Sequence, residues 1–148
     1  MYQNILVPTD GSTLSKRAVA PAAFLAREGG GAVTVLGVAP GAAAEAVEHI
    51  LLPLALPEEQ GEARDSVAEV EAELHGEGVE RVQGVVARGD AADQIVAEAE
   101  RRGVDLIVMS SHGRSALRDV LIGSVAEDVI TRASCPVLLL RPEDDGAG

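Results

Sequence analysis

The sequence predicts an α/β fold, in which helices flank a parallel sheet of five strands. Short aliphatic runs alternate along the chain with longer stretches of helical periodicity, and this alternation is typical of strand–helix–strand units with parallel strands. Two of the runs, Leu106–Met109 and Val137–Leu140, are apolar throughout. The first of them suits a strand buried on both faces. The five predicted strands are Ile5–Val7, Val33–Val38, Val82–Val86, Leu106–Met109 and Val137–Leu140.

Length and composition indicate one globular domain spanning residues 1–148. A chain of 148 residues can bury a core of ordinary size. Hydrophobic residues make up 47% and charged residues 24%, as in soluble globular proteins. Only 1% of the residues are aromatic, so the core must be built from Val, Leu, Ile and Ala. No internal repeat or linker is apparent.

The net charge of −12 argues against nucleic acid and against anionic membrane surfaces as partners. A phosphate site in this chain must therefore act locally, through N–H groups, a helix dipole, arginines or a metal ion. No apolar run approaches the roughly 20 residues of a membrane helix, and the first residues lack a signal-peptide pattern. Cys135 is the only cysteine, which excludes an internal disulfide. We therefore expect a cytoplasmic protein.

The first half of the chain begins with a strand at Ile5–Val7 and a turn at Pro8–Ser12. A helix should follow, and Pro21 inside it should kink it by removing a backbone hydrogen bond. Its apolar face consists of Leu14, Ala18, Ala22 and Leu25. Gly29–Gly31 should end that helix. These glycines precede a strand, whereas a dinucleotide-binding loop follows one, so they do not indicate a phosphate loop.

The middle of the chain is less regular. Four proline and glycine positions punctuate the segment Pro40–Pro57, which we expect to form a flap or insertion near the strand ends. A helix is predicted from about Glu59 to Leu74, with its inner face at Ala63, Val67, Val70 and Leu74. The strand Val82–Val86 is polar enough for a sheet edge. Asp90 should cap the next helix, whose inner face is Ala92, Ile95, Val96 and Ala99.

The stretch Leu106–Ala133 organises the chain. A buried strand breaks into the small polar residues Ser110-Ser111-His112-Gly113, and a new helical pattern begins after Gly123. Ser124 and Glu127 have the spacing of a capping box. A helix N-terminus offers N–H groups and the positive end of a dipole, and glycine lets an anion approach the backbone. The stretch therefore predicts an anion-binding loop suited to phosphate.

The same stretch resembles the nucleotide loop of the universal stress protein family. ATP-binding members of that family carry Gly, two residues, Gly, nine residues and Gly-Ser/Thr. Gly113 and Gly123-Ser124 fit this spacing, but Ser110 occupies the position of the first glycine. The resemblance covers essentially the whole chain, from ILVPTDGS at its start to CPVLLLR near its end. It is less specific for nucleotide binding than for the family, because some members bind none.

The resemblance implies an adenine nucleotide alpha-hydrolase-like fold with strand order 3-2-1-4-5. The order then reverses between the first and fourth strands, and ligands bind beyond the carboxyl ends of strands at such a point. The implied ligand is ATP, or AMP or ADP, with or without Mg²⁺ on the phosphates, and the implied role lies in a stress response. The matching positions are Asp10, Val38, Met109, Ser110, Gly113, Arg114, Gly123, Ser124 and Val125.

Several residues in and near these positions have more than one interpretation. Asp10 is either a turn carboxylate or, as the resemblance implies, a contact at the adenosine end of ATP. Arg114 and Arg118 are either solvated arginines or a source of positive charge for phosphates. His112 either holds the loop by hydrogen bonds or touches the ligand. Ser124 serves as a helix cap, as a phosphate contact, or as both.

Ser110 also has two interpretations. If the family's glycine supplies a positive φ, a serine there is strained. If that glycine only permits close approach, serine fits, and its hydroxyl adds a donor for a phosphate.

The sequence favours a binding protein over an enzyme. It has no G-x-x-x-x-G-K-[ST] loop, its only lysine is Lys16, and it has no G-x-S-x-G elbow. No metal-ligand cluster or Cys/His pair is evident by spacing, and no catalytic residue is predicted. Two alternatives stay open, a slow ATP hydrolase and an interaction module that binds no nucleotide.

The last strand predicts a homodimer. The implied strand order places Val137–Leu140 at the sheet edge although it is apolar on both faces, and only Pro136 and Arg141 flank it. Antiparallel pairing of two copies would satisfy this edge with two-fold symmetry. Related family members dimerise through this strand, and the resemblance implies the same here.

Overall fold

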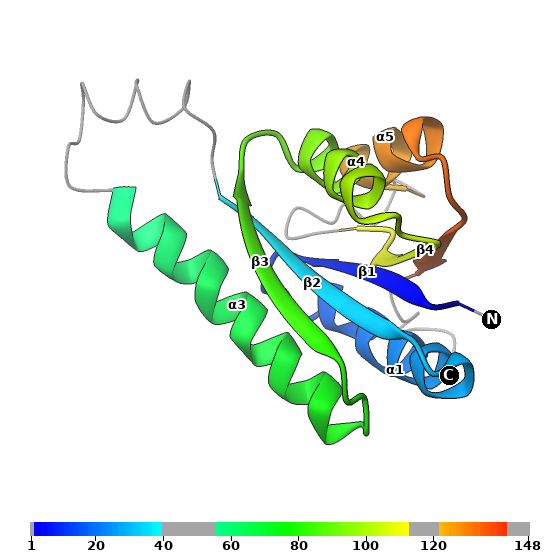
Figure 1. Ribbon diagram of the computed structural model, residues 1–148. Coiled ribbons are helices and arrows are strands. Elements are labelled where there is room, and N and C mark those ends of the chain that lie inside the picture. Colours follow the sequence, from blue (N-terminus) through cyan, green and yellow to red (C-terminus); the bar gives the residue numbers. More distant parts are fainter. Residues whose placement is uncertain (1, 40–55, 113–121, 142–148) are drawn as a thin grey trace, which may run out of the picture.

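A computed structural model of the chain describes residues 2–39, 56–112 and 122–141. The predictions for Pro40–Pro57 fall almost wholly outside this range, as do Gly113, Arg114 and Arg118. In order, the elements are β1 (Asn4–Thr9), the 3₁₀ turn η1 (Ser15–Ala18), α1 (Val19–Gly29), β2 (Ala32–Ala39), α3 (Leu56–Gly76), β3 (Val82–Arg88), α4 (Ala91–Arg102), β4 (Leu106–Ser110), α5 (Ser124–Arg132) and β5 (Val137–Leu140). Figure 1 shows their arrangement.

The five strands form one sheet in the order β3-β2-β1-β4-β5. All four strand pairs are parallel, so the predicted fold class and strand order are confirmed. β1 lies between β2 and β4, and the chain reverses its direction of winding there. The carboxyl ends of all strands therefore lie along one edge of the sheet, with Thr9 of β1 paired with Gly37 of β2.

Two layers of helices cover the sheet (Figure 1). α1 and α3 lie on one face, where Ile5, Val7, Val33 and Val35 join their apolar side chains in one core cluster. α4 and α5 lie on the other face, where Leu6, Leu36 and Ile107 meet Ile95 and Val129. β4 is buried at every residue, as predicted for a strand covered on both faces.

Glycines let α3 approach the sheet closely. A Cβ at Gly37 of β2 would lie 3.1 Å from the carbonyl oxygen of Ala63 and 2.8 Å from a methyl group of Val67. A Cβ at Gly84 of β3 would overlap the Glu71 carboxylate and Val67. Val67, Val70 and Leu74 are buried as predicted. The packing of α3 thus depends on the missing side chains in β2 and β3.

The helix after β1 differs from the prediction. The segment begins as the 3₁₀ turn η1, and the α-helix starts only at Val19. Pro21 is therefore in the first turn of α1, where a backbone N–H has no intrahelical acceptor, so the expected kink in a helix interior is wrong. The predicted end is confirmed, because Gly30 caps α1 with a φ of 65°.

α4 matches its predicted cap and inner face. The Asp90 carboxylate accepts the N–H of Asp93 at 3.1 Å, and Ala92, Ile95, Val96 and Ala99 are buried. Glu98 is also buried, and its carboxylate accepts hydrogen bonds from Arg101 and, at 2.8 Å, from Arg102. The hydrogen bond from Arg101 is the main reason that the pKa of the Glu98 carboxyl lies below its usual value; Arg102 adds to this, and burial opposes it.

Among the described residues, no helix combines the length and apolar character needed to cross a bilayer.

Candidate functional site

The carboxyl end of β1 forms a tight hydrogen-bonded turn. Gly11 has a φ of 81°, a conformation that favours glycine. The Ser12 N–H donates to Asp10 Oδ1 at 2.9 Å, and the Gly11 N–H donates to Thr9 Oγ1 at 3.1 Å. Asp10 thus has the turn function that its Asp-Gly context suggested, and its half-buried carboxylate lies at the switch-point edge.

At the carboxyl end of β4, the Ser110 side chain forms hydrogen bonds with the backbone of the following turn. Its hydroxyl donates to the His112 carbonyl oxygen at 2.5 Å and accepts the His112 N–H at 3.2 Å. No non-glycine residue in the described part of the chain has a positive φ, so the interpretation of a strained serine is wrong. Ser110 fits the close-approach alternative, but its hydroxyl proton is directed to His112 within the turn.

His112 holds this loop by hydrogen bonds. Its side chain is 8% exposed, and Nδ1 lies 3.0 Å from the Ser111 hydroxyl oxygen. His112 therefore has the first of its two predicted roles, which is to hold the loop by hydrogen bonds.

Ser111 joins three elements. It is 1% exposed, its N–H donates to the Leu140 carbonyl of β5 at 2.8 Å, and its carbonyl accepts the Gly123 N–H at 2.7 Å. The end of β4 is thereby fixed to the end of β5 and to the start of α5. The sequence shows Ser111 only as one of several small polar residues, and no spacing signal marks this role.

The start of α5 corrects the predicted capping box. Gly123 is the N-cap, no side chain among the described residues caps the helix, and the Gly123 carbonyl accepts the Glu127 N–H at 3.0 Å. Ser124 is thus the first helical residue. A Cβ at Gly123 would lie 3.0 Å from the Ser111 carbonyl oxygen, so close packing against β4 selects glycine where a capping serine was expected.

An uncapped helix start has a chemical consequence. The N–H groups of Ser124 and Val125 belong to the first turn, which has no intrahelical acceptors for them. Both residues are exposed, and the helix dipole adds partial positive charge there. The arrangement can accept an anion at the carboxyl edge of the sheet.

Most of the predicted site residues share that edge. Asp10 follows β1, Val38 is near the end of β2, and Met109 and Ser110 end β4. Gly123, Ser124 and Val125 begin α5, which the Ser111–Gly123 hydrogen bond holds against the end of β4. Gly113 and Arg114 lie outside the described residues.

Two further observations concern chemistry. Within residues 2–39, 56–112 and 122–141, no three His, Cys, Asp or Glu side chains converge in a way that could hold a metal ion. Burial raises the pKa of the Cys135 thiol, which disfavours the nucleophilic thiolate.

The sheet order, the switch-point edge and the uncapped helix define an α/β protein of the adenine nucleotide alpha-hydrolase-like fold. A sequence model described as the universal stress protein family matches residues 1–141. The chain belongs to the universal stress protein family.

Individual relatives agree with this assignment. Universal stress protein MJ0531 of Methanocaldococcus jannaschii is 38% identical over 146 residues, which cover 95% of this chain and 83% of that protein. Universal stress protein YxiE of Bacillus subtilis is 29% identical, and the match covers 95% of this chain and all of YxiE.

Solved structures give the same result. The structure of MJ0577 is 31% identical with a TM-score of 0.85, covering 98% of this chain and 99% of that one. A universal stress protein from Archaeoglobus fulgidus in complex with dAMP is 26% identical with a TM-score of 0.73, covering 93% of this chain and 97% of that one.

Proposed function

We propose that this protein binds an adenine nucleotide at the carboxyl edge of its sheet and acts as a cytoplasmic nucleotide-dependent regulator in a stress response. The observation that carries the proposal is the uncapped N-terminus of α5, held beside the end of β4 by the Gly123–Ser111 hydrogen bond. The related Archaeoglobus fulgidus protein forms a complex with dAMP, which supports an adenine nucleotide as the ligand class.

In this proposal, one group of residues contacts the phosphates of the nucleotide and another group contacts its adenosine part. The N–H groups of Ser124 and Val125, together with the Gly113 loop and Arg114, receive the phosphates, with or without Mg²⁺. Asp10 and the strand ends at Val38 and Met109 receive the adenosine part. Ser110 acts indirectly, because its hydroxyl shapes the turn through His112.

The binding test compares three proteins. Mass spectrometry of the denatured wild-type protein should detect a co-purified adenine nucleotide, and calorimetric titration with AMP, ADP and ATP should measure its affinity. Gly113→Val should abolish binding, since a branched side chain would occupy the space of the phosphates. Gly61→Val is the matched control, because a Cβ at Gly61 of α3 meets no atom within 4 Å.

The titration has a decisive negative outcome. Equal nucleotide affinity of Gly113→Val and the wild-type protein would show that the nucleotide does not bind at this loop. Failure of the wild-type protein to bind any of the three nucleotides would instead favour an interaction module of the same fold.

We also propose that the protein is a homodimer paired through β5. β5 lies at the edge of the sheet, and Leu138 in its middle is 38% exposed. An apolar edge strand with free backbone groups is a template for pairing with a second copy.

A further inference from the structure

A solvent-open hollow of about 470 Å³ lies where β1, β2 and β3 begin, at the opposite edge of the sheet from the candidate nucleotide site. Its volume is within the range of small-ligand sites. The lining holds two arginines, four amide or hydroxyl side chains and no carboxylate: Gln3, Asn4, Ala32, Val33, Thr34, Arg81, Val82, Gln83 and Arg102. A lining without acidic residues is notable in a chain of net charge −12.

Thr34 of β2 is the first unusual group of this hollow. It is 5% exposed and pairs in register with Leu6 of β1 and Gln83 of β3. Its side chain therefore points to the α4 face of the sheet, as do those of Leu6 and Leu36. The hydroxyl forms no hydrogen bond with any residue in the described part of the chain, and it is not among the fully enclosed atoms that lack a partner. The hydroxyl is therefore open to the hollow, where it can form a hydrogen bond with a bound molecule.

Arg102, at the end of α4, supplies directional donors. Its Nε donates to Glu98 at 2.8 Å and its Nη1 to Gln83 Oε1 at 3.3 Å. Its Nη2 meets no acceptor among the described residues. Glu98 also accepts from Arg101, so one carboxylate is shared by two guanidinium groups. This cluster keeps one excess positive charge, and Arg81 adds another on the β3 side of the hollow.

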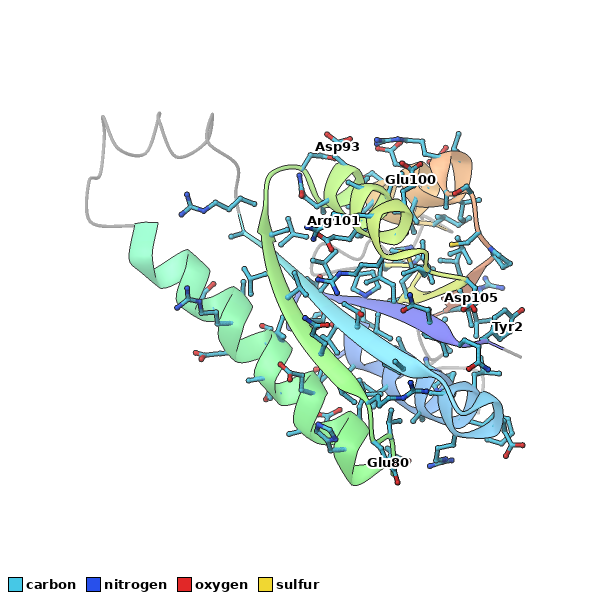
Figure 2. The ribbon with its side chains drawn as sticks, in the orientation of Figure 1. Tyr2, Glu80, Asp93, Glu100, Arg101 and Asp105 are labelled. Atoms are coloured by element: carbon cyan, nitrogen blue, oxygen red, sulfur yellow. The ribbon has the colours of Figure 1, made fainter. Side chains whose placement is uncertain are left out.

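Several hydrogen-bond acceptors at this edge are paired with donors of the chain itself. Asp105, labelled at this edge in Figure 2, accepts the backbone N–H groups of Gln3 and Asn4 at 2.9 and 3.1 Å. Carbonyls at the ends of α1 and α4 accept side-chain donors as well: Gly29 from Gln3, Gly30 from Arg81, and Arg102 from Asn4. These bonds offset the negative ends of the helix dipoles that would otherwise repel an anion.

We propose that this hollow is a second ligand site, separate from the nucleotide site, and that it takes a small oxyanion such as a carboxylate or a phosphate. Arg102 and Arg81 contact the anionic oxygens, and Thr34 and Gln83 supply neutral hydrogen bonds from the sheet. Planar guanidinium groups with free N–H donors suit carboxylate and phosphate.

The test is an NMR titration of the full chain with inorganic phosphate and, separately, with malonate, against sodium chloride of equal ionic strength. The backbone amide signals of Thr34 and Gln83 should shift and saturate, with a dissociation constant of about 1 mM or below for at least one anion. A response to malonate alone identifies a carboxylate site, and a response to phosphate alone identifies a phosphate site.

Two variants test the assignment. Arg81→Gln should weaken binding at least about tenfold, as expected for loss of a charge-assisted hydrogen bond. Thr34→Val preserves the side-chain shape and should also weaken binding, while thermal unfolding without ligand occurs at an equal or higher temperature. Arg64→Gln, an exposed charge change on α3, is the matched control and should bind like the wild-type protein.

Three results would overturn the proposal. The first is the absence of saturation by either anion. The second is a response confined to Ser124 and Val125 at the other edge of the sheet. The third is equal weakening by Arg64→Gln and Arg81→Gln, which would reduce the effect to general electrostatics.

Discussion

Ser110 shows how one side chain can replace a glycine without strain. Both of its hydrogen bonds go to the backbone of His112, two residues further along the chain. The turn is therefore held by the Ser110 side chain.

Ser110→Ala should lower the free energy of unfolding by about 1–2 kcal/mol, because two hydrogen bonds in a buried turn are lost. Nucleotide affinity should fall less than stability does. Urea denaturation and calorimetric titration of the same samples measure both quantities. A large loss of affinity with unchanged stability would show that the hydroxyl serves the ligand directly.

Glu98 makes a prediction about pH. The pKa of its carboxyl is lower in the folded protein than the unperturbed value, so the stabilisation is complete above the unfolded pKa of about 4.3 and is lost as pH falls through the folded value. Glu98→Gln should thus reduce stability at pH 7 and differ little from the wild-type protein near pH 3, as measured by urea unfolding. A difference that is equal at both pH values would assign the effect of Glu98 to packing.

The placement of α3 depends on Gly37 of β2. A Cβ there would approach the backbone of α3 at Ala63, and a helix backbone cannot rotate away as a flexible side chain can. The same helix contains Gly61, where an added Cβ meets open space.

Gly37→Ala should therefore destabilise the protein by about 1–3 kcal/mol through overpacking. Gly61→Ala should stabilise it by about 0.5–1 kcal/mol, because alanine loses less backbone entropy in a helix. Thermal and chemical unfolding of the two variants measure these changes. If both substitutions stabilised the protein, α3 would have to pack too loosely on β2 for a Cβ at position 37 to meet Ala63.

The pattern of apolar residues predicted the order of strands and helices in the chain well. Continuous apolar runs located β4 and β5, and the helical spacing of apolar residues located α4, because both patterns are local properties of the sequence. The same reasoning missed the N-cap of α5, since the choice of Gly123 depends on the distance to Ser111, a residue distant in sequence. It also missed the 3₁₀ start before α1. The role of Ser111 needed three elements to be placed together before it could be recognised.

The proposed dimer depends on the backbone groups of β5 that point away from β4. The carbonyls of Pro136 and Leu140 accept the N–H groups of Ile107 in β4 and of Ser111 directly after it, so the N–H of Leu139 points away from β4 toward the sheet edge. Leu139→Pro removes that outward donor and leaves the β4–β5 hydrogen bonds in place.

Sedimentation equilibrium should find a dimer for the wild-type chain and a monomer for Leu139→Pro. Circular dichroism of the variant checks that it is folded. A monomeric wild-type chain, or a folded variant that remains fully dimeric, would place the contact elsewhere.

The hydrogen bond from Ser111 to Leu140 has a consequence for the order of events during synthesis. The ribosome releases the N-terminal elements first, and β5 is the last strand of the sheet. Until Leu140 is in place, the end of β4 lacks the acceptor of the Ser111 N–H, and the start of α5 lacks a fixed anchor. A growing chain can thus place β1 to β4 before the crevice at their carboxyl ends is held in its final form by β5.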